Sequence, residues 1–288
     1  MINSIEDSEH QDFLRHKKEF ELFYNKVSKY VPFDNLNIVD IGASWGMHIG
    51  FIVNSGAEYV TGIDIADYNE YFKGDYKFKI AQYYEKHGYK LTSNKYDLVR
   101  TDAQKIALKS SSFDIAVSIN AFEHIPNPEL ALLELIRILK PGGYAFISFI
   151  PVFFCDEGSH MINYIKEPWA HLMYNEEEYI KMLRDAIPDT EYFVNEYRYG
   201  LNKLPRKFYL DLFNKYNSGN SGNSGKKFIN VIKKLLNKNY CKFSIVEIEE
   251  WNGVGDEKYL LHENFEKLKK RYSTEDLLFR GMNIVLKK

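Results

Sequence analysis

The strongest constraint on the fold of this chain is a strand–turn–helix–strand pattern between Ile38 and Asp64. A β-branched run ends in a glycine-bearing turn, an apolar helix follows over about 46–55, and a second β-branched run ends in an acid. This order predicts a β-α-β unit whose turn lies at the carboxyl end of a strand, where open α/β sheets bind ligands. Gly42 and Gly46 allow the backbone to approach such a ligand closely.

Two ligand classes fit this turn. A dinucleotide requires the G-x-G-x-x-G spacing, but Ser44 and Met47 occupy the second and third glycine positions. Asp40 adds a carboxylate directly before the turn, which would repel a phosphate. S-adenosylmethionine carries a sulfonium and an amine and no phosphate, so an acidic turn suits it better. Asp64, about 20 residues further on, can accept the hydroxyls of a ribose in either ligand.

Composition and charge restrict the class of protein. With 288 residues, 45% of them hydrophobic, the chain can bury one sizeable core and a subdomain. A net charge of −2 gives no electrostatic case for a nucleic-acid partner. Two cysteines exclude a disulfide framework and a cysteine-rich zinc site. The polar, acidic start shows no signal peptide, and the apolar run 144–155 is too short to span a bilayer. We therefore expect a cytoplasmic protein without membrane insertion.

The rest of the first half alternates between helices and strands. We expect an amphipathic helix over 7–30, strands over 36–41, 96–101, 113–119 and 144–150, and a helix over 128–139. Pro141 and the two glycines after it end that helix and turn the chain. The aromatic-rich segment 65–95 is longer than a simple crossover, which leaves two interpretations: an amphipathic helix with core contacts, or a lid over the ligand.

Several motifs in this order carry a family resemblance. They read Asp-Ile-Gly-Ala-Ser-Trp-Gly from Asp40, Gly-Ile-Asp ending at Asp64, Thr-Asp-Ala from Thr101, Asn-Ala-Phe-Glu-His-Ile-Pro from Asn120, and Arg-Ile-Leu-Lys-Pro-Gly-Gly from Arg137. Together they resemble the class I S-adenosylmethionine-dependent methyltransferases, in the branch that acts mainly on small molecules. The resemblance covers about 36–149, and it departs from the family pattern at Ser44, where glycine is usual.

The resemblance implies S-adenosylmethionine as the cofactor and assigns residues to it. Asp40 and Gly42 would line the methionine amine, with Ser44 and Gly46 in the same turn. Asp64 would hold the ribose, and Ile65 would pack beside the adenine. Asp102 would accept from the adenine amino group, with Ala103 adjacent, and Asn120 would offer its backbone near the sulfonium. A structural alternative for Asp102 is a helix N-cap.

The second half reads as an insertion followed by the end of the sheet. Aromatic residues crowd 151–240, which we interpret as a substrate cap containing a flexible Asn/Ser/Gly loop at 217–225. The basic amphipathic stretch 226–238 is a helix packed on its domain or, alternatively, a membrane-surface contact. Strands over 243–249 and 282–286, with helix over 258–272 between them, would complete the sheet.

These elements predict an α/β, Rossmann-like, doubly wound seven-stranded sheet with its last strand antiparallel. The predicted division is a helical segment at 1–35, the cofactor-binding core at 36–150, the inserted cap at 151–240, and the closing strands at 241–288. A homodimer stays an alternative to a monomer.

The predicted chemistry is methyl transfer to a small molecule, most simply to a hydroxyl of a saccharide or another hydroxylated metabolite. A hydroxyl acceptor benefits from a base, and histidine has a suitable ordinary pKa. His124 and His160 follow the fourth and fifth strands and are the candidate catalytic residues; His171 and Glu123 are the next candidates. We expect no metal, because no trustworthy ligand spacing is visible. The alternatives are a small-molecule N-methyltransferase, an inactive cofactor-binding partner subunit, and a dinucleotide-dependent oxidoreductase.

Overall fold

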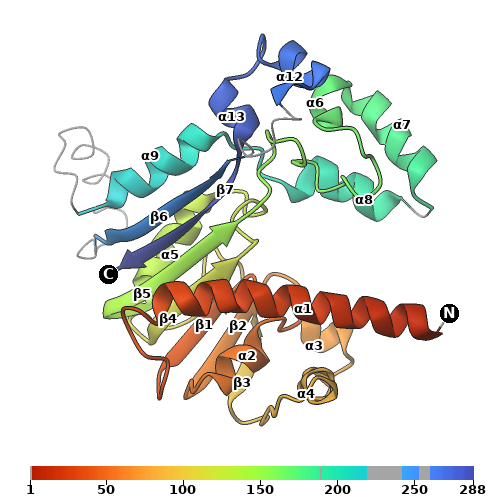
Figure 1. The fold of residues 1–288 in the computed structure, drawn as a ribbon. Coiled ribbons are helices and arrows are strands. Elements are labelled where there is room, and N and C mark those ends of the chain that lie inside the picture. Colours follow the sequence, from red (N-terminus) through yellow and green to blue (C-terminus); the bar gives the residue numbers. More distant parts are fainter. Residues whose placement is uncertain (1, 189, 219–241, 253–259) are drawn as a thin grey trace. The chain divides into compact units, whose positions relative to one another are not determined.

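The computed structural model describes residues 2–188, 190–218, 242–252 and 260–288 (Figure 1). Its elements in the first half are α1 (Ile2–Val27), β1 (Asn37–Ile41), α2 (Ile49–Asn54), β2 (Tyr59–Asp64), α3 (Tyr68–Tyr71), α4 (Tyr76–Lys86), β3 (Tyr96–Arg100), β4 (Phe113–Ile119), α5 (Pro128–Ile138) and β5 (Leu139–Phe149). Those in the second half are α6 (Ala170–Met173), α7 (Glu176–Ala186), α8 (Glu191–Asn195), the π-helix η1 (Glu196–Gly200), α9 (Arg206–Tyr216), β6 (Ser244–Asn252), α12 (Glu263–Leu268), α13 (Thr274–Leu278) and β7 (Phe279–Lys287).

The strands form one seven-stranded sheet in the order β3-β2-β1-β4-β5-β7-β6. β1 pairs in parallel with β2 and β4, and β2 pairs in parallel with β3. β7 runs antiparallel to β5, because Gly142 donates to the Lys288 carbonyl while Lys288 donates to the Gly143 carbonyl (Figure 1). The predicted Rossmann-like, doubly wound sheet with an antiparallel last strand is therefore confirmed.

The chain forms two compact units. Unit 1 comprises Met1–Ile119, Glu129–Ile147 and Val285–Lys288, and unit 2 comprises Asn120–Pro128 and Ser148–Ile284. The boundaries predicted from the sequence at 35, 150 and 240 stay a prediction. Among the described helices, none combines the length and the apolar character needed to cross a membrane.

Unit 1 is built around strands buried on both faces. In β1 the last four residues are buried, and in β4 all but Asp114 are, which explains their continuous apolar sequences. The long helix α1 contributes aromatic residues to this core. The ring of Phe23 lies 5.6 Å from that of Phe146 in β5, and the ring of Phe13 lies 5.2 Å from that of Phe51 in α2.

The crossover between β2 and β3 forms α3 and α4. In α4 the buried Tyr84 packs edge-on against Phe51, and its hydroxyl donates to the Met47 carbonyl at 2.5 Å. Gly50 is required beneath this ring, because a Cβ there would lie 2.4 Å from a Tyr84 ring carbon. These contacts fit the interpretation of α4 as a core-packing helix. The short α3 instead touches the glycine turn through Tyr68, whose hydroxyl lies 3.0 Å from Ser44 Oγ.

Unit 2 has a separate, aromatic-rich core. The amphipathic α7 begins with a capping box between Asn175 and Glu178 and buries Tyr179, Ile180 and Leu183. Tyr179 packs against Tyr197 of η1, with ring centroids 4.7 Å apart. The aromatic residues that the sequence concentrates after the fifth strand thus form much of this interior.

Several predicted boundaries differ from the structure. α2 begins at Ile49 rather than at residue 46, because the chain stays in turns through His48. β5 begins at Leu139, immediately after α5, because the stretch around Gly142 pairs with the chain's last residue instead of forming a free turn. α6, α8, η1, α9 and α13 were not predicted. Most of the predicted loop 217–225 and the whole predicted helix 226–238 lie outside the described residues.

Candidate active site

The glycine turn after β1 is held against the end of β2. The amides of Gly42 and Ala43 both donate to the Ile63 carbonyl, at 2.9 and 3.0 Å. Gly42, Ser44 and Gly46 have φ angles of 78°, 50° and 101°, so the turn repeatedly enters the left-handed region. This conformation is natural for glycine but strained for Ser44, which accounts for the glycine that the family usually has there.

Asp64 closes this arrangement from β2. Its carboxylate accepts hydrogen bonds from the Ser44 amide at 2.8 Å and from the Ala66 amide at 2.9 Å. The side chain is only half-buried, so its oxygens can still accept from a ligand. The following residue, Ile65, is 69% exposed although it is apolar. An oriented acceptor beside an uncovered apolar side chain is the environment that a ribose and a purine ring require.

Asp40 lies at the end of β1 and belongs to a buried ionic cluster. Its carboxylate is 3.5 Å from His48 Nδ1, and Glu19 of α1 is 3.1 Å from His48 Nε2. Burial lowers the pKa of His48, but hydrogen bonds to Asp40 and Glu19 outweigh it and raise that pKa to about 9. Burial raises the pKa of Glu19, yet the bond to His48 leaves it below its ordinary value. Asp40 is therefore held by an imidazolium rather than standing open at the turn.

Asp102 and Ala103 follow β3 beside Asp64, because the Thr101 amide donates to the Asp64 carbonyl at 2.8 Å. Asp102 Oδ1 accepts from the Gln104 amide at 2.8 Å, and Lys105 donates to the Asp102 carbonyl. These bonds make a turn, and no helix follows within the described loop 101–112. The alternative role of Asp102 as a helix N-cap is therefore wrong.

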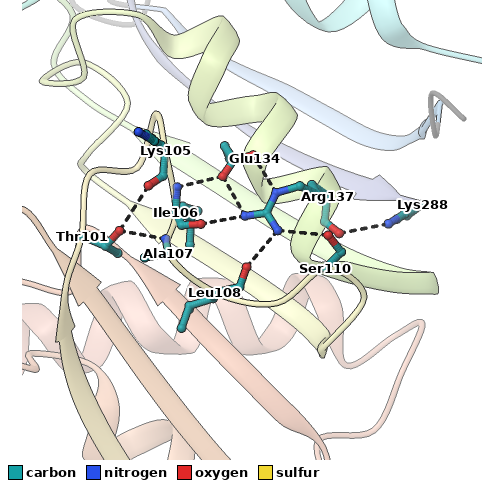
Figure 2. Close-up of polar contacts among 9 residues, drawn as sticks. All are labelled: Thr101, Lys105, Ile106, Ala107, Leu108, Ser110, Glu134, Arg137 and Lys288. Carbon is teal, nitrogen blue, oxygen red and sulfur yellow. Dashed lines mark hydrogen bonds and ion pairs between the residues drawn. The ribbon is translucent and has the colours of Figure 1, made fainter. Parts of the chain in front are cut away.

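Arg137 of α5 holds the loop that carries Asp102. Figure 2 shows its guanidinium between the loop backbone and Glu134. It donates to the carbonyls of Ile106 and Leu108, each at 2.8 Å, and forms a bidentate pair with Glu134 at 2.7 Å. Glu134 in turn accepts from the Ile106 amide at 2.8 Å. The two charged side chains thus supply hydrogen bonds to backbone groups that would otherwise be paired within a helix or strand.

The remaining candidates lie in unit 2. Asn120 has a φ of 51°, and its amide donates to the Ser148 carbonyl at 2.8 Å. The rings of His124 and His160 meet edge to face, with centroids 5.1 Å apart. His171 is elsewhere in the core, where its Nε2 donates to the Phe153 carbonyl at 2.6 Å. The structure therefore brings His124 and His160 together, as the two candidate catalytic residues of the sequence. His171, the next candidate, takes no part in their ring contact.

The two histidines have opposite electrostatic environments. His124 Nδ1 lies 2.8 Å from the Gly200 carbonyl and 3.1 Å from Glu196. Burial lowers its pKa, but the bond to Glu196 and the nearby Glu123 raise it to about 9. Burial lowers the pKa of His160 to about 4, helped by the charge of His124. His160 Nε2 donates to the Pro151 carbonyl at 2.8 Å.

Sequence reasoning missed Glu19, His48, Glu196 and the supporting role of Arg137. His48 follows Gly46 closely, so its place near the turn could have been noticed. Nothing in the sequence pairs it with Glu19 of α1, because that contact depends on how a helix crosses the sheet. Glu196 was equally hidden, since it lies in the unpredicted π-helix η1.

The sheet order defines a Rossmann-like fold, and Asp64 is the last residue of its second strand. Two solved structures share it along most of the chain. One is a protein proposed to be a sarcosine dimethylglycine methyltransferase from Galdieria sulphuraria, with 13% identity, a TM-score of 0.51, and coverage of 94% of this chain and 85% of that one. The other is the MccD protein, with 14% identity, a TM-score of 0.50, and coverage of 94% and 96%. At such identities the likeness concerns the fold alone.

Sequence comparisons find relatives of part of the chain. Residues 39–147 match the model of a methyltransferase domain. Sterol 4-C-methyltransferase strm-1 of Caenorhabditis elegans is 34% identical over 110 residues, which are 38% of this chain and 30% of the relative. The mitochondrial ubiquinone biosynthesis O-methyltransferase of Dictyostelium discoideum is 27% identical over 135 residues, 45% of this chain and 41% of the relative. The predicted class I methyltransferase family is thus confirmed for this segment, which spans less than half the length of these relatives.

Proposed function

We propose that this chain transfers a methyl group from S-adenosylmethionine to a hydroxyl group of a small molecule. The observation that carries the proposal is the half-buried carboxylate of Asp64, oriented by two backbone amides and adjoining the exposed Ile65. A ribose bound there gains a charged acceptor, and an adenine gains an apolar surface. The family of residues 39–147 supports the same cofactor.

The acidity of the turn favours this cofactor over a dinucleotide. Asp64 places a carboxylate at the end of β2, and the buried cluster behind the turn combines the two carboxylates of Asp40 and Glu19 with one imidazolium, so that it carries a net negative charge. A pyrophosphate would be repelled by this net negative charge, whereas an amine and a sulfonium would be attracted. When bound, S-adenosylmethionine supplies a methyl group already activated on a positively charged sulfur.

The chain's own task is to hold the acceptor in line with the carbon–sulfur bond, which can contribute several kcal/mol. The acceptor oxygen forms the new bond to the methyl carbon, and the electron pair of the broken bond stays on sulfur as the thioether. The hydroxyl proton must leave, and His124 and His160 are the residues we propose to act on that hydroxyl. Their rings meet in unit 2, where His124 lies in the loop after β4 and His160 lies in the segment that the sequence predicted as the substrate cap.

The names of the relatives bear on the acceptor atom. Ubiquinone biosynthesis O-methyltransferases favour oxygen, which agrees with the histidine pair. Sterol C-methyltransferases name carbon as the second candidate. A small amine stays a third alternative, because a neutral amine needs less help from a base.

The acceptor atom can be tested with a panel of small molecules. The purified chain is incubated with S-adenosylmethionine labelled in its methyl group and with matched hydroxyl, amine and sterol compounds. We expect label in a methyl ether and one S-adenosylhomocysteine released per methyl transferred. Transfer confined to nitrogen or carbon would contradict the hydroxyl assignment while leaving the methyltransferase activity intact.

A further inference from the structure

We propose that Glu123, His124 and His160 form a binding site for one divalent transition-metal ion. Each of these side chains offers one ligand atom, and the three atoms lie within 4.8 Å of one another. Among the described His, Cys, Asp and Glu side chains, this is the one trio that converges in this way. Two imidazoles and one carboxylate are a common ligand set for such ions, and they leave further coordination positions open.

The orientation of both rings supports this assignment. A carbonyl oxygen can only accept, so His124 Nδ1 and His160 Nε2 carry the protons that they donate to Gly200 and Pro151, each at 2.8 Å. The opposite nitrogens, Nε2 of His124 and Nδ1 of His160, are then the ones left for a ligand. Metal-binding histidines in proteins are typically fixed by a bond of this kind, from the non-ligating nitrogen to a carbonyl or a carboxylate.

Glu196 provides a second acceptor, which is charged, for the proton on His124 Nδ1. One of its oxygens lies 3.1 Å from His124 Nδ1, beside the Gly200 carbonyl. A carboxylate behind a ligating imidazole makes the ring a stronger electron donor toward the metal.

The backbone that carries Glu123 and His124 is also fixed. Asn202 donates through its side chain to the carbonyls of Phe122 and Ile125, at 2.7 and 3.0 Å, and through its amide to the Glu123 carbonyl at 2.9 Å. Its side-chain oxygen accepts from the Tyr209 hydroxyl at 2.9 Å. The loop after β4 is thus held by Asn202, which precedes α9 and is itself held by Tyr209 of that helix, as a preorganised site requires.

The nature of the ligands limits the metal. Mg²⁺, Ca²⁺ and Mn²⁺ prefer oxygen ligands, whereas imidazole nitrogens suit Fe²⁺, Ni²⁺, Cu²⁺ and Zn²⁺. A further consequence rests on the proposed function. An acceptor hydroxyl bound at an open coordination position of the metal would lose its proton to water more readily. The two histidines would then act as metal ligands instead of as free bases.

Metal binding can be measured without any acceptor. Chelator-treated protein is titrated with Co²⁺ and followed by visible absorption, and Zn²⁺ is titrated by calorimetry. We expect one ion per chain, and at least a tenfold weaker affinity in His160→Ala and in Glu123→Gln. His10→Ala is the matched control, since His10 is an exposed histidine of α1, and it should bind the ion like the parent.

Glu196→Gln keeps all three proposed ligands and serves if a ligand variant fails to fold. It should weaken the affinity by about 10–100-fold, the usual effect of removing such a supporting carboxylate. A parent protein without saturable Co²⁺ absorption, or a folded His160→Ala that binds Co²⁺ like the parent, would overturn the site. S-adenosylhomocysteine is titrated into the same samples. Binding of it without Co²⁺ binding refutes the metal site alone, and the reverse result refutes the proposed cofactor alone.

Discussion

Ser44 shows how a single residue reports on the backbone of the glycine turn. Its φ of 50° is unfavourable for any residue with a Cβ, and its hydroxyl lies 3.0 Å from that of Tyr68. Two substitutions separate these effects, because Ser44→Ala and Ser44→Gly both lose the hydroxyl and only glycine relieves the backbone. The difference between these two variants therefore measures the cost of the dihedral angle alone.

We predict that Ser44→Gly is more stable than Ser44→Ala by about 1 kcal/mol, the usual difference in the left-handed region. Urea unfolding of the two variants measures it directly. This order is the reverse of that seen in helices and strands, where alanine is the more stable. An equal or higher stability of the alanine variant would show that residue 44 is not left-handed in solution.

At the scale of elements, α1 is tied to β1 through the charged His48. A pKa raised from 6.5 to about 9 means that this contribution to stability is complete below pH 6.5 and is lost as the pH rises through 9. The lowered pKa of Glu19 acts in the other direction, so its contribution is lost as the pH falls below 4.5. Nearby Arg15 and His16 also face this cluster, and burial lowers the pKa of His16 to about 4.

We therefore predict that the free energy of unfolding decreases between pH 7 and pH 9.5 in the parent protein. In Glu19→Gln the decrease should be smaller, because His48 loses one of its two carboxylates. Urea unfolding at fixed ionic strength gives both curves. Glu21→Gln is the matched control in α1, since Glu21 is exposed and pairs only loosely with Lys17 at 3.8 Å. Parallel curves for parent and Glu19→Gln would contradict the assigned charge of His48.

The loop after β3 depends on α5 in a comparable way. Arg137→Lys keeps the charge but cannot reach the Ile106 and Leu108 carbonyls and Glu134 together. We predict a loss of about 1–3 kcal/mol in unfolding free energy, the range for hydrogen bonds to charged groups. Amides 106–108 should also exchange faster with deuterium. Arg184→Lys is the control, because Arg184 forms an exposed pair with Glu191 and should change stability by less than about 1 kcal/mol.

For the whole molecule, the sequence predicted the sheet well and the second unit poorly. β1, β2 and β4 were found because buried parallel strands are continuous apolar runs bounded by turns. α8, η1 and α9 were missed, because aromatic residues spread over 151–216 give no clear helical period. In the site, residues within motifs such as Asp64 and Asp102 could be predicted. Glu19, Glu196 and Asn202 could not, because their roles arise from contacts distant in the sequence.

No metal was expected from the sequence because only the spacing of candidate ligands was considered, and spacing does not detect ligands that are distant in the sequence. Glu123 and His124 are adjacent, but His160 lies beyond the fifth strand, and no short pattern contains all three. Only folded unit 2 brings their ligand atoms within 4.8 Å. Spacing detects ligands that share one element, whereas this trio combines a loop with a distant turn.

The central claim is that the turn between β1 and β2 binds S-adenosylmethionine through Asp64. Calorimetric titration with S-adenosylhomocysteine and with NAD tests it most directly, using the parent, Asp64→Ala and Glu58→Ala. Glu58 is the matched acid, because it lies at the opposite end of β2 and pairs on the surface with Lys95. We predict that the parent binds S-adenosylhomocysteine and not NAD. Asp64→Ala should weaken that binding by about 1–3 kcal/mol, and Glu58→Ala should leave it unchanged. Binding of NAD without S-adenosylhomocysteine, or unchanged affinity in Asp64→Ala, would contradict the account.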